Sequence, residues 1–274
     1  MESKLKITIN DVKRLFKNLI FLGDNLDIVK PLYKYMDVES AINFLQTRTL
    51  SFVEPSSWYD PFEKRFYNAD FSAIPNFTKP KLFASCFTQK PTNEASWVMC
   101  SYFKNGLASK SIRLEFNPIL LYDLLDKLGS YTKTKIVISK VNYTLPERSI
   151  KALHKKDSKY HSEYFNTFNI DKFINLMLIK RKAFEYEKEL RIFITPTQDT
   201  PKEVIQSFEN TNKIQMSGDA HLLIDLIKSI MISPNCTPME TEMIEKKVNE
   251  ITNGIIKCKQ SGLYQSFDTI TIEQ

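Results

Sequence analysis

The stretch AFEYEKELRIF, residues 183–193, decides the fold prediction because charged and apolar side chains alternate along its second half. Neighbouring side chains of a β-strand point to opposite faces of the sheet. As a strand, the stretch would place Glu187, Glu189 and Arg191 in a row on one face. The apolar residues of the opposite face, which we expect to pack on a core, are Leu190, Ile192 and Ile194. The charged row is either a half-exposed surface with a weak ion pair or a functional site.

The composition fits a soluble globular protein that buries a real core, with 42% hydrophobic and 26% charged residues in a chain of 274. Glycine is scarce, with only 6 in the chain. A dinucleotide-binding fingerprint needs three closely spaced glycines, and a P-loop needs two ahead of Lys-Ser/Thr. Neither pattern occurs, so we expect neither a Rossmann-type NAD site nor a Walker-type NTPase.

The charge pattern permits an anionic partner such as a nucleic acid but does not require one, because the net charge is only +6. Basic residues concentrate at LHKKDSKYH (153–161) and IKRK (179–182), and we expect both to be solvated faces.

The four cysteines form no CxxC pair and the three histidines share no metal-ligand spacing, so no metal site is predicted. No leader-like segment and no long apolar run occurs, which predicts a cytoplasmic protein without a membrane partner.

Hydrophobic periodicity predicts a single mixed α+β domain, because helices interrupt short strands too irregularly for a doubly wound sheet. The predicted strands are PLYKYM (31–36), KLFASCF (81–87), SIRLEF (111–116), KTKIVISKVNY (133–143) and FDTITIEQ (267–274). The predicted helices are TNEASWVMCSYFKNGL (92–107), NPILLYDLLDKLG (117–129), NIDKFINLMLIKRK (169–182) and TPMETEMIEKKVNEITNG (237–254). A helix followed by a strand is predicted for MDVESAINFLQTRTLSFV (36–53) and for AHLLIDLIKSIMISP (220–234).

Capping residues support several of these helices. Asp37 and Asn117 are candidate N-caps, and Thr237 with Glu240 matches a capping box. Gly129 is predicted to close the helix that begins after Asn117. The polar stretch 195–218 is predicted to be an edge hairpin or a mobile loop.

Two aromatic clusters stand out as candidate binding residues. Tyr33 and Tyr35 would share one face of the first core strand, with Lys34 on the other. An aromatic ring of this kind either packs in a core or stacks on a flat heterocycle. Trp97 shares a helix face with Ser101, and a buried Trp is more often a core residue than a ligand platform.

The segment WYDPFEKRF (58–66) is a third cluster. Pro55 and Pro61 are expected to break regular structure here. Asp60 before Pro61 suggests a turn in which the carboxylate bonds its own local backbone. Taken alone, this cluster is more easily explained as structural.

Five motifs in a fixed order resemble the bacterial domain-of-unknown-function family 2971. They are LYKYM, LSFVEPSSWYDPFE, FASCFTQKPTNEASWVMCSYFKNG, FEYEKELRIFI and IMISP. The resemblance covers about residues 31–250 of a single domain spanning 1–274, with residues 1–30 as a predicted N-terminal helical extension. It marks Asp60, Pro61, Phe62 and Glu63 as family-motif residues. The chain departs from the family pattern at Tyr59, where Asn is usual, and at Cys100, where Tyr is usual, and Tyr102 lies near the latter.

The order of an aromatic first strand, a helix and strand, and a late Glu-x-Glu strand also resembles, more distantly, the ADP-ribosyltransferase fold. That resemblance implies a split-sheet core that binds NAD as substrate without a glycine-rich loop. By this resemblance Glu189 would stabilise positive charge on the ribose and hold its 2′-hydroxyl. Glu187 would orient or deprotonate the acceptor. The implied NAD-binding residues are Tyr33, Lys34, Tyr35, Trp97 and Arg191.

The resulting prediction is an ADP-ribosyltransferase-like enzyme or NAD glycohydrolase. It would act on a nucleic acid or protein as a bacterial toxin or phage-defence effector. Its predicted partners include an antitoxin. The main alternative is a non-catalytic nucleotide- or partner-binding module in which Glu187 and Arg191 are a structural pair. The third is a metal-dependent nuclease built on Asp60, Glu63 and the Glu pair. A concave pocket holding Glu189 beside Tyr33 or Tyr35 would favour the enzyme, and a tight salt bridge would favour the module.

Overall fold

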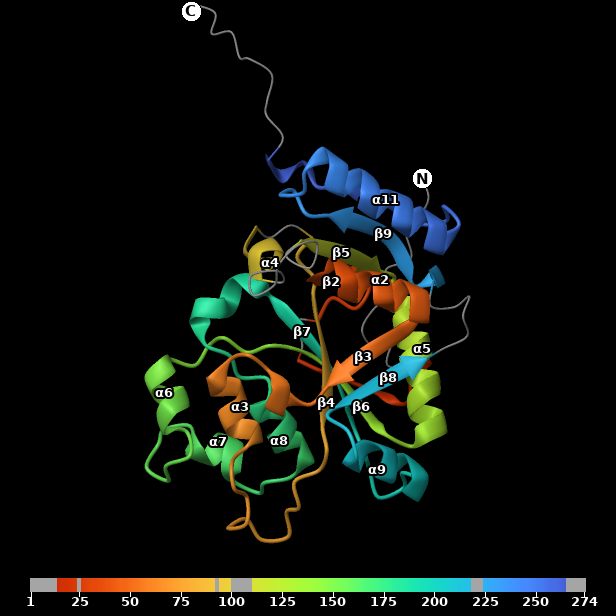
Figure 1. The fold of residues 1–274 in the computed structure, drawn as a ribbon. Helices are drawn as coiled ribbons and strands as arrows, with labels where there is room; N and C mark the ends of the chain where they lie inside the picture. Colours follow the sequence, from red (N-terminus) through yellow and green to blue (C-terminus); the bar gives the residue numbers. More distant parts are fainter. Residues whose placement is uncertain (1–13, 24–25, 92–93, 100–109, 218–223, 265–274) are drawn as a thin grey trace, which may run out of the picture.

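A mixed β-sheet with helices on both faces organises the protein in the computed structural model (Figure 1). The structure describes residues 14–23, 26–91, 94–99, 110–217 and 224–264. Within these ranges ten strands join one sheet in the order β1-β6-β7-β4-β2-β5-β9-β10, while β3 pairs with β4 and β8. The strands are β1 (Leu19–Leu22), β2 (Leu32–Asp37), β3 (Thr49–Val53), β4 (Phe83–Thr88), β5 (Ser111–Phe116), β6 (Lys135–Lys140), β7 (Glu189–Thr195), β8 (Lys213–Ser217), β9 (Ile227–Ile232) and β10 (Lys257–Gln260).

The pairing confirms the predicted α+β class. Strands β1 and β6 are parallel, as are β9 and β10, and the other described pairs are antiparallel. The α-helices are α2 (Val38–Thr47), α3 (Pro61–Tyr67), α4 (Glu94–Met99), α5 (Pro118–Thr132), α6 (Glu147–Ala152), α7 (His161–Phe165), α8 (Ile170–Leu176), α9 (Lys202–Glu209) and α11 (Pro238–Thr252). The 3₁₀ helices are η1 (Pro55–Ser57), η3 (Lys182–Glu187) and η4 (Gly262–Tyr264). None of the helices in the described ranges is both long and apolar enough to cross a membrane.

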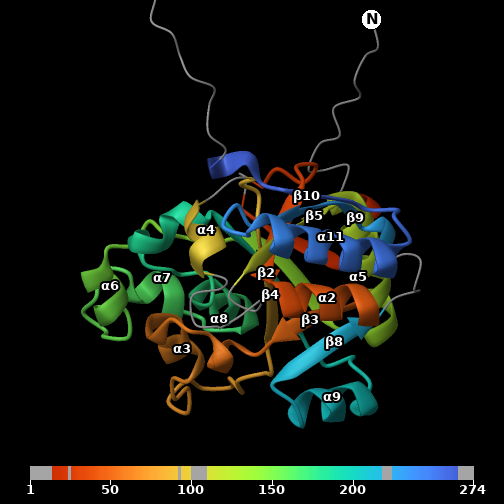
Figure 2. The same ribbon diagram turned by 45° about the horizontal axis from the view of Figure 1, so that its top comes forward.

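Each face of the sheet carries its own hydrophobic core. Helices α2, α5 and α11 contribute to the larger core, and Figure 2 shows α11 beside α2. Helices α3, α6, α7 and α8 contribute to the smaller core, on the left in Figure 1. As predicted, Leu190, Ile192 and Ile194 of β7 pack into the larger core. Phe193 points into the smaller one, so β7 is buried on both faces and cannot present a solvated charged row.

The sheet is almost divided between β2 and β4. These strands are paired at a single position, Tyr33 with Thr88. By contrast β4 pairs with β7 at six positions, from Phe83↔Ile194 to Thr88↔Glu189. One half of the sheet therefore reaches β4, beside which β3 and β8 continue it, and the other half ends at β2. The two halves meet near the beginning of β7.

The helix caps follow the predicted local chemistry. The Asp37 carboxylate accepts a hydrogen bond from the backbone N–H of Ser40 at 2.8 Å and begins α2. Asn117 begins α5, and the capping box of Thr237 and Glu240 begins α11. Each cap satisfies backbone N–H groups that have no partner within the helix.

Two expectations about helix ends were wrong. Gly129 does not close α5, which continues to Thr132 and ends where Lys133 adopts a left-handed conformation. The glycine instead permits close packing, because a Cβ atom there would lie 3.3 Å from both Asn18 Cβ and Ile136 Cδ1. The predicted helix 169–182 ends at Leu176, because the backbone of Leu178 and Lys180 pairs with Asn142.

Three further segments differ from the prediction. Pro61 begins α3 instead of breaking structure, because proline lacks only an N–H that the first turn leaves unbonded. The stretch 195–218 contains α9, whose Phe208 packs against Phe83 at a ring-centroid distance of 5.1 Å, and β8, which pairs with β3. Within the predicted N-terminal helical extension, residues 19–22 form β1 instead. The predicted strand 267–274 lies outside the described residues, as does most of the predicted helix 92–107 beyond α4.

Candidate functional site

The segment that precedes β7 is a 3₁₀ helix, so the prediction that Glu187 lies on the strand was wrong. Glu187 ends η3, Lys188 adopts a left-handed conformation with φ of 45°, and β7 begins at Glu189. The Thr88 hydroxyl donates to the carbonyl oxygens of Glu187 and Lys188 at 2.8 and 3.2 Å, and the N–H of Glu189 donates to the Tyr143 hydroxyl at 3.1 Å. These bonds hold the turn against neighbouring strands, and both carboxylates still reach one cluster.

Arg191 is the centre of that cluster. Its guanidinium is 1% exposed and donates to both carboxylate oxygens of Glu189, from Nε at 2.9 Å and from Nη2 at 2.8 Å. It also donates to Glu63 of α3 and to the carbonyl oxygen of Met177. Such a bidentate guanidinium–carboxylate pair fixes the geometry of both groups.

Lys180 joins the third carboxylate to the cluster. Its ammonium contacts Glu187 directly and donates to Glu189 Oε2 at 3.0 Å, and it lies 3.8 Å from Glu63 Oε2. Glu63, Glu187 and Glu189 therefore share the two cations Lys180 and Arg191. With all five groups ionised, the cluster carries one negative charge in excess.

The three carboxyls respond differently to this environment. Burial raises the pKa of Glu187 to about 7, with Glu189 and Glu63 adding to the rise and Lys180 opposing it. Burial also raises the pKa of Glu63, despite Arg191. Burial disfavours charge on Glu189 too, yet Arg191 and Lys180 outweigh it and hold the pKa of this carboxyl well below its usual range. Glu189 is therefore a fixed anion, and Glu187 is the group that exchanges a proton near neutral pH.

The cluster borders a cavity of about 650 Å³, which we call the carboxylate pocket. Trp58, Tyr59 and Phe184 supply aromatic surface, and Met99 supplies an apolar wall. The remaining lining residues are Asp60, Pro61, Glu63, Cys86, Lys180, Arg181, Glu187, Glu189 and Arg191. The combination of apolar surface with convergent polar groups is typical of small-molecule sites.

Polar atoms without partners lie at this pocket. Arg181 Nη2 donates to Asp60 Oδ1 at 3.1 Å, but Arg181 Nε and Asp60 Oδ2 are buried with no hydrogen-bond partner among the described residues. Trp58 Nε1 likewise has no hydrogen-bond partner among the described residues. The Trp58 indole stacks on Arg191, with 4.2 Å from the guanidinium carbon to the ring centroid. Leaving such groups unpaired costs about 1–3 kcal/mol each, so a ligand or water that bonds them is favoured.

The aromatic residues predicted to stack on a heterocycle lie outside the carboxylate pocket, although they are on the same face of the sheet as Arg191. Tyr33 stacks on Arg113, at 4.7 Å from the guanidinium carbon to the ring centroid. Tyr35 packs edge-on against Trp97, with ring centroids 4.8 Å apart. Lys34 donates to the Ser85 hydroxyl from the opposite face of the sheet. None of these four predicted residues lines the carboxylate pocket, and Arg191 does.

The family-motif residues have defined positions. As predicted, Asp60 bonds its own backbone and accepts from the N–H of Phe62 at 2.9 Å, which caps α3. The Phe62 ring covers the Arg181 guanidinium carbon at 4.4 Å. Tyr59 lines the pocket, while Cys100 and Tyr102 lie outside the described residues.

Sequence reasoning missed Lys180, Arg181, Trp58 and Phe184. The IKRK segment was predicted to be a solvated face, yet the Lys180 side chain is only 10% exposed. The missed signal was the 3-residue spacing of Arg181, Phe184 and Glu187, which places them on one side of a 3₁₀ helix.

No group of three or more His, Cys, Asp or Glu within the described residues is arranged to hold a metal ion. The Cys86 thiol lies beside Glu189, and burial raises the pKa of that thiol, which keeps it protonated at neutral pH. The acidic groups instead pair with cations, as Asp60 does with Arg181 and Glu63 with Arg191.

Compared with known proteins, the chain matches no family model, no curated protein and no solved structure. The family resemblance drawn from its motifs therefore stays a prediction.

Proposed function

We propose that the protein is an ADP-ribosyltransferase-like enzyme that cleaves the bond between nicotinamide and ribose in NAD, with the carboxylate pocket as its site. The observation that carries the proposal is the set of three carboxylates sharing two cations beside aromatic surface. When Glu187 is ionised, the excess of negative charge favours a cation in the pocket, such as the nicotinamide ring of NAD or the positive charge that develops on the ribose as the bond breaks.

The roles of the carboxylates follow from their environments. Glu189 is fixed by Arg191 and Lys180, so it supplies a preorganised negative charge that needs no reorientation during the reaction. Glu187, with a pKa of about 7, is suited to take the proton of the attacking acceptor or water. The electron pair of the broken bond leaves with nicotinamide, and the acceptor oxygen or nitrogen forms the new bond to the ribose.

The structure modifies the predicted contacts to NAD. Trp58 and Phe184 line the pocket where Tyr33 and Tyr35 were expected, so we assign ring stacking to them. The near division of the sheet between β2 and β4 is compatible with a split-sheet core. A toxin or phage-defence role stays part of the proposal through the resemblance alone.

Two observations favour the alternative of a non-catalytic binding module: Tyr33 and Tyr35 lie outside the carboxylate pocket, and Glu189 forms a tight salt bridge with Arg191. Both oxygens of Glu189 already accept hydrogen bonds from Arg191, and Glu63 and Arg191 are 6% and 1% exposed. An ion cluster this buried also holds α3 against β7, which is a structural role.

Nicotinamide release from NAD separates the two functions. The purified protein is compared with Glu187→Gln and with Glu203→Gln, which removes the same charge from the exposed surface of α9, outside the carboxylate pocket. Mixed RNA, mixed DNA and cell lysate serve as acceptors. We expect release by the wild type and Glu203→Gln, and a loss of about 100-fold in Glu187→Gln, the contribution typical of a general base. The wild-type rate should rise with pH through about 7, as Glu187 loses its proton.

Absence of release by the wild type with every acceptor would reject the enzyme and support the binding module. Equal rates in Glu187→Gln and wild type would remove Glu187 from the mechanism.

A further inference from the structure

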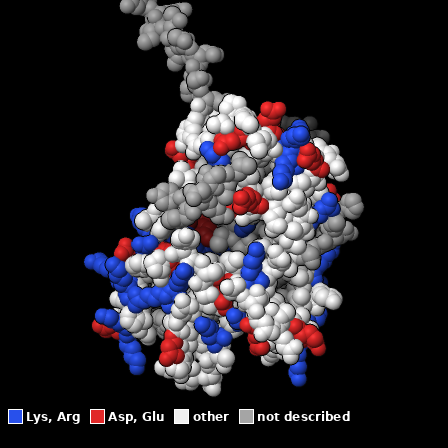
Figure 3. Space-filling model, viewed as in Figure 1, with Lys and Arg blue, Asp and Glu red and all other residues white. Residues whose placement is uncertain are grey.

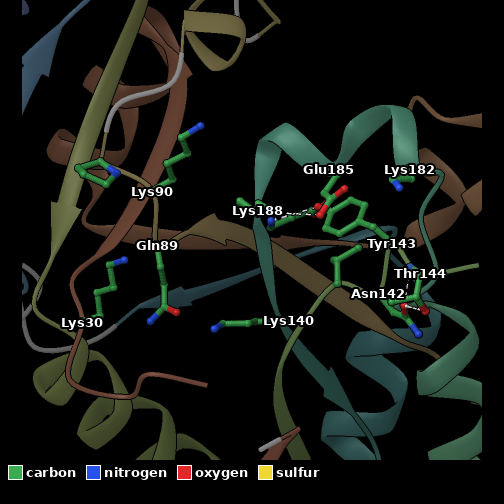
Figure 4. Close-up of a pocket in the computed structure, with 13 residues that line it drawn as sticks. Lys30, Gln89, Lys90, Lys140, Asn142, Tyr143, Thr144, Lys182, Glu185 and Lys188 are labelled. Atoms are coloured by element: carbon green, nitrogen blue, oxygen red, sulfur yellow. Dashed lines mark hydrogen bonds and ion pairs between the residues drawn. The ribbon is translucent and has the colours of Figure 1, made fainter. Parts of the chain in front are cut away.

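A second cavity, of about 660 Å³, lies on the other side of η3 and is lined by lysines (Figure 4). We call it the lysine pocket. Its basic residues are Lys30, Lys90, Lys140, Lys182 and Lys188, and its other labelled residues are Gln89, Asn142, Tyr143, Thr144 and Glu185. In Figure 4, Lys30 and Lys90 border one side of the cavity and Lys182 and Lys188 the other.

The 3₁₀ geometry of η3 separates the two pockets. Side chains three residues apart lie on the same side of such a helix. Lys182, Glu185 and Lys188 therefore face the lysine pocket, whereas Phe184 and Glu187 face the carboxylate pocket. Glu189, the first residue of β7, borders both cavities. The two sites are thus neighbours across one turn of backbone.

The positive charge of the lysine pocket is poorly compensated. Glu185 forms a salt bridge with Lys188, with 2.9 Å between Oε1 and Nζ. Glu189 forms salt bridges with Arg191 and Lys180 of the cluster. Lys30, Lys90 and Lys182 are exposed and form no ion pair with any carboxylate of the described residues. Like charges around a cavity repel one another and raise the local concentration of anions.

The type of anion follows from the lining. The lysines come from four separate segments, between β1 and β2, after β4, at the end of β6 and along η3, so their charges are spread around the cavity. Among the residues that the structure describes, no arginine lines the pocket, and planar bidentate capture of a single phosphate depends on arginine. Spread lysines with amide and hydroxyl groups are the contacts that proteins make to successive phosphates of a nucleic-acid strand.

We propose that the lysine pocket binds the phosphate backbone of a single-stranded nucleic acid. A duplex, whose major groove alone is about 12 Å wide, is too broad to enter a cavity of about 660 Å³, whereas a short piece of a single strand can enter it. The binding is independent of NAD chemistry. Only the further step, that the bound strand is the acceptor presented to Glu187 and Glu189, rests on the proposed function.

Fluorescence anisotropy without NAD tests the binding. Labelled mixed-sequence RNA and DNA 20-mers, single-stranded and duplex, are titrated with wild type and with the Lys90→Gln/Lys182→Gln variant between about 0.05 and 0.3 M salt. The control is Lys155→Gln/Lys156→Gln, which removes the same charge from the exposed basic surface over α6 and α7, visible at lower left in Figure 3. Unfolding temperatures establish that all three proteins are folded.

We expect single strands to bind the wild type more tightly than duplexes and the pocket variant to bind them about tenfold more weakly at 0.1 M salt. The binding constant of the pocket variant should depend less steeply on salt. The slope of its log binding constant against log salt should be less negative than that of the wild type by about 1.4, or roughly 0.7 for each lost phosphate contact, and the control should keep the wild-type slope.

Three results would overturn the proposal. Absence of binding to every strand would do so. A loss of affinity in the Lys155→Gln/Lys156→Gln control, with wild-type affinity in the pocket variant, would do so too. Displacement of the strand by equimolar pyrophosphate or NAD would show that the pocket takes a compact diphosphate. None of these results depends on nicotinamide release, so the two proposals fail separately.

Discussion

Replacing Glu187 by Gln should remove a pH-dependent penalty on folding. The Glu187 side chain is 24% exposed and lies among Lys180, Glu189 and Glu63. Burial raises the pKa of Glu187 from 4.5 to about 7, so between these pH values the folded protein binds a proton that the unfolded chain releases. Stability conferred on the fold by this proton is present below pH 4.5 and is lost as the pH rises through about 7.

The magnitude follows from the size of that interval. Each pH unit corresponds to 1.36 kcal/mol of differential protonation, so the full loss between pH 4.5 and 7 is about 3 kcal/mol. Gln cannot ionise, and the Glu187→Gln variant therefore lacks this loss. Its free energy of unfolding at pH 8 minus that at pH 5 should exceed the same difference in the wild type by about 2–3 kcal/mol, because this window covers most of the titration.

Urea unfolding followed by Trp fluorescence at pH 5 and pH 8 measures these differences. Glu185→Gln is the matched control, because Glu185 is half-exposed on the other side of η3, away from the buried cluster, and the substitution should leave the wild-type pH dependence in place. Subtracting the two values within each protein cancels any loss of the Lys180 contact that is common to both pH values. Comparing the two proteins then cancels the titration of carboxyls that do not interact with Glu187.

Parallel pH dependences in wild type and Glu187→Gln would refute the reasoning. That result would mean that Lys180 compensates Glu187 fully, and Glu187 would then be unsuited to act as a base near neutral pH.

Three other substitutions test the structure by urea unfolding. Arg191→Met should destabilise the protein by about 3–5 kcal/mol, since it leaves buried carboxylates unpaired, and a loss below 1 kcal/mol would argue against the buried cluster. Tyr67→Phe removes the hydroxyl that donates to Glu54 Oε1 at 2.6 Å and should cost about 1–3 kcal/mol, whereas an unchanged midpoint would mean that Glu54 is satisfied by other donors. Thr237→Ala should cost about 1 kcal/mol by removing the cap bonded to the Glu240 N–H at 3.2 Å, and no change would show that α11 begins without it.

Local patterns predicted much of the secondary structure. Asp37 and Thr237 begin α2 and α11 as expected, because a cap acts on N–H groups two or three residues away. The alternation in SIRLEF likewise predicted β5 correctly, because one face of a strand is decided by its own residues.

The residues around the beginning of β7 show where prediction from local patterns fails. The alternation of Leu190 and Ile192 correctly predicted their burial. Extending the same alternation back to Glu187 was wrong, since the Thr88 hydroxyl, donated from another strand, holds the backbone of Glu187 and Lys188 in a turn. Nothing within the segment itself indicates that contact.

The sequence by itself determined the α+β class, most of the strands and the capped helices, because the interactions responsible act over a few residues. Only the tertiary structure decided the candidate site. Glu63 meets Arg191 across 128 positions of the chain, and Lys180 unites three carboxylates because α8 ends early to pair with Asn142. Contacts of this kind depend on how the sheet and helices pack, since Coulomb attraction in a buried site acts between groups that are near in space, whatever their separation in sequence.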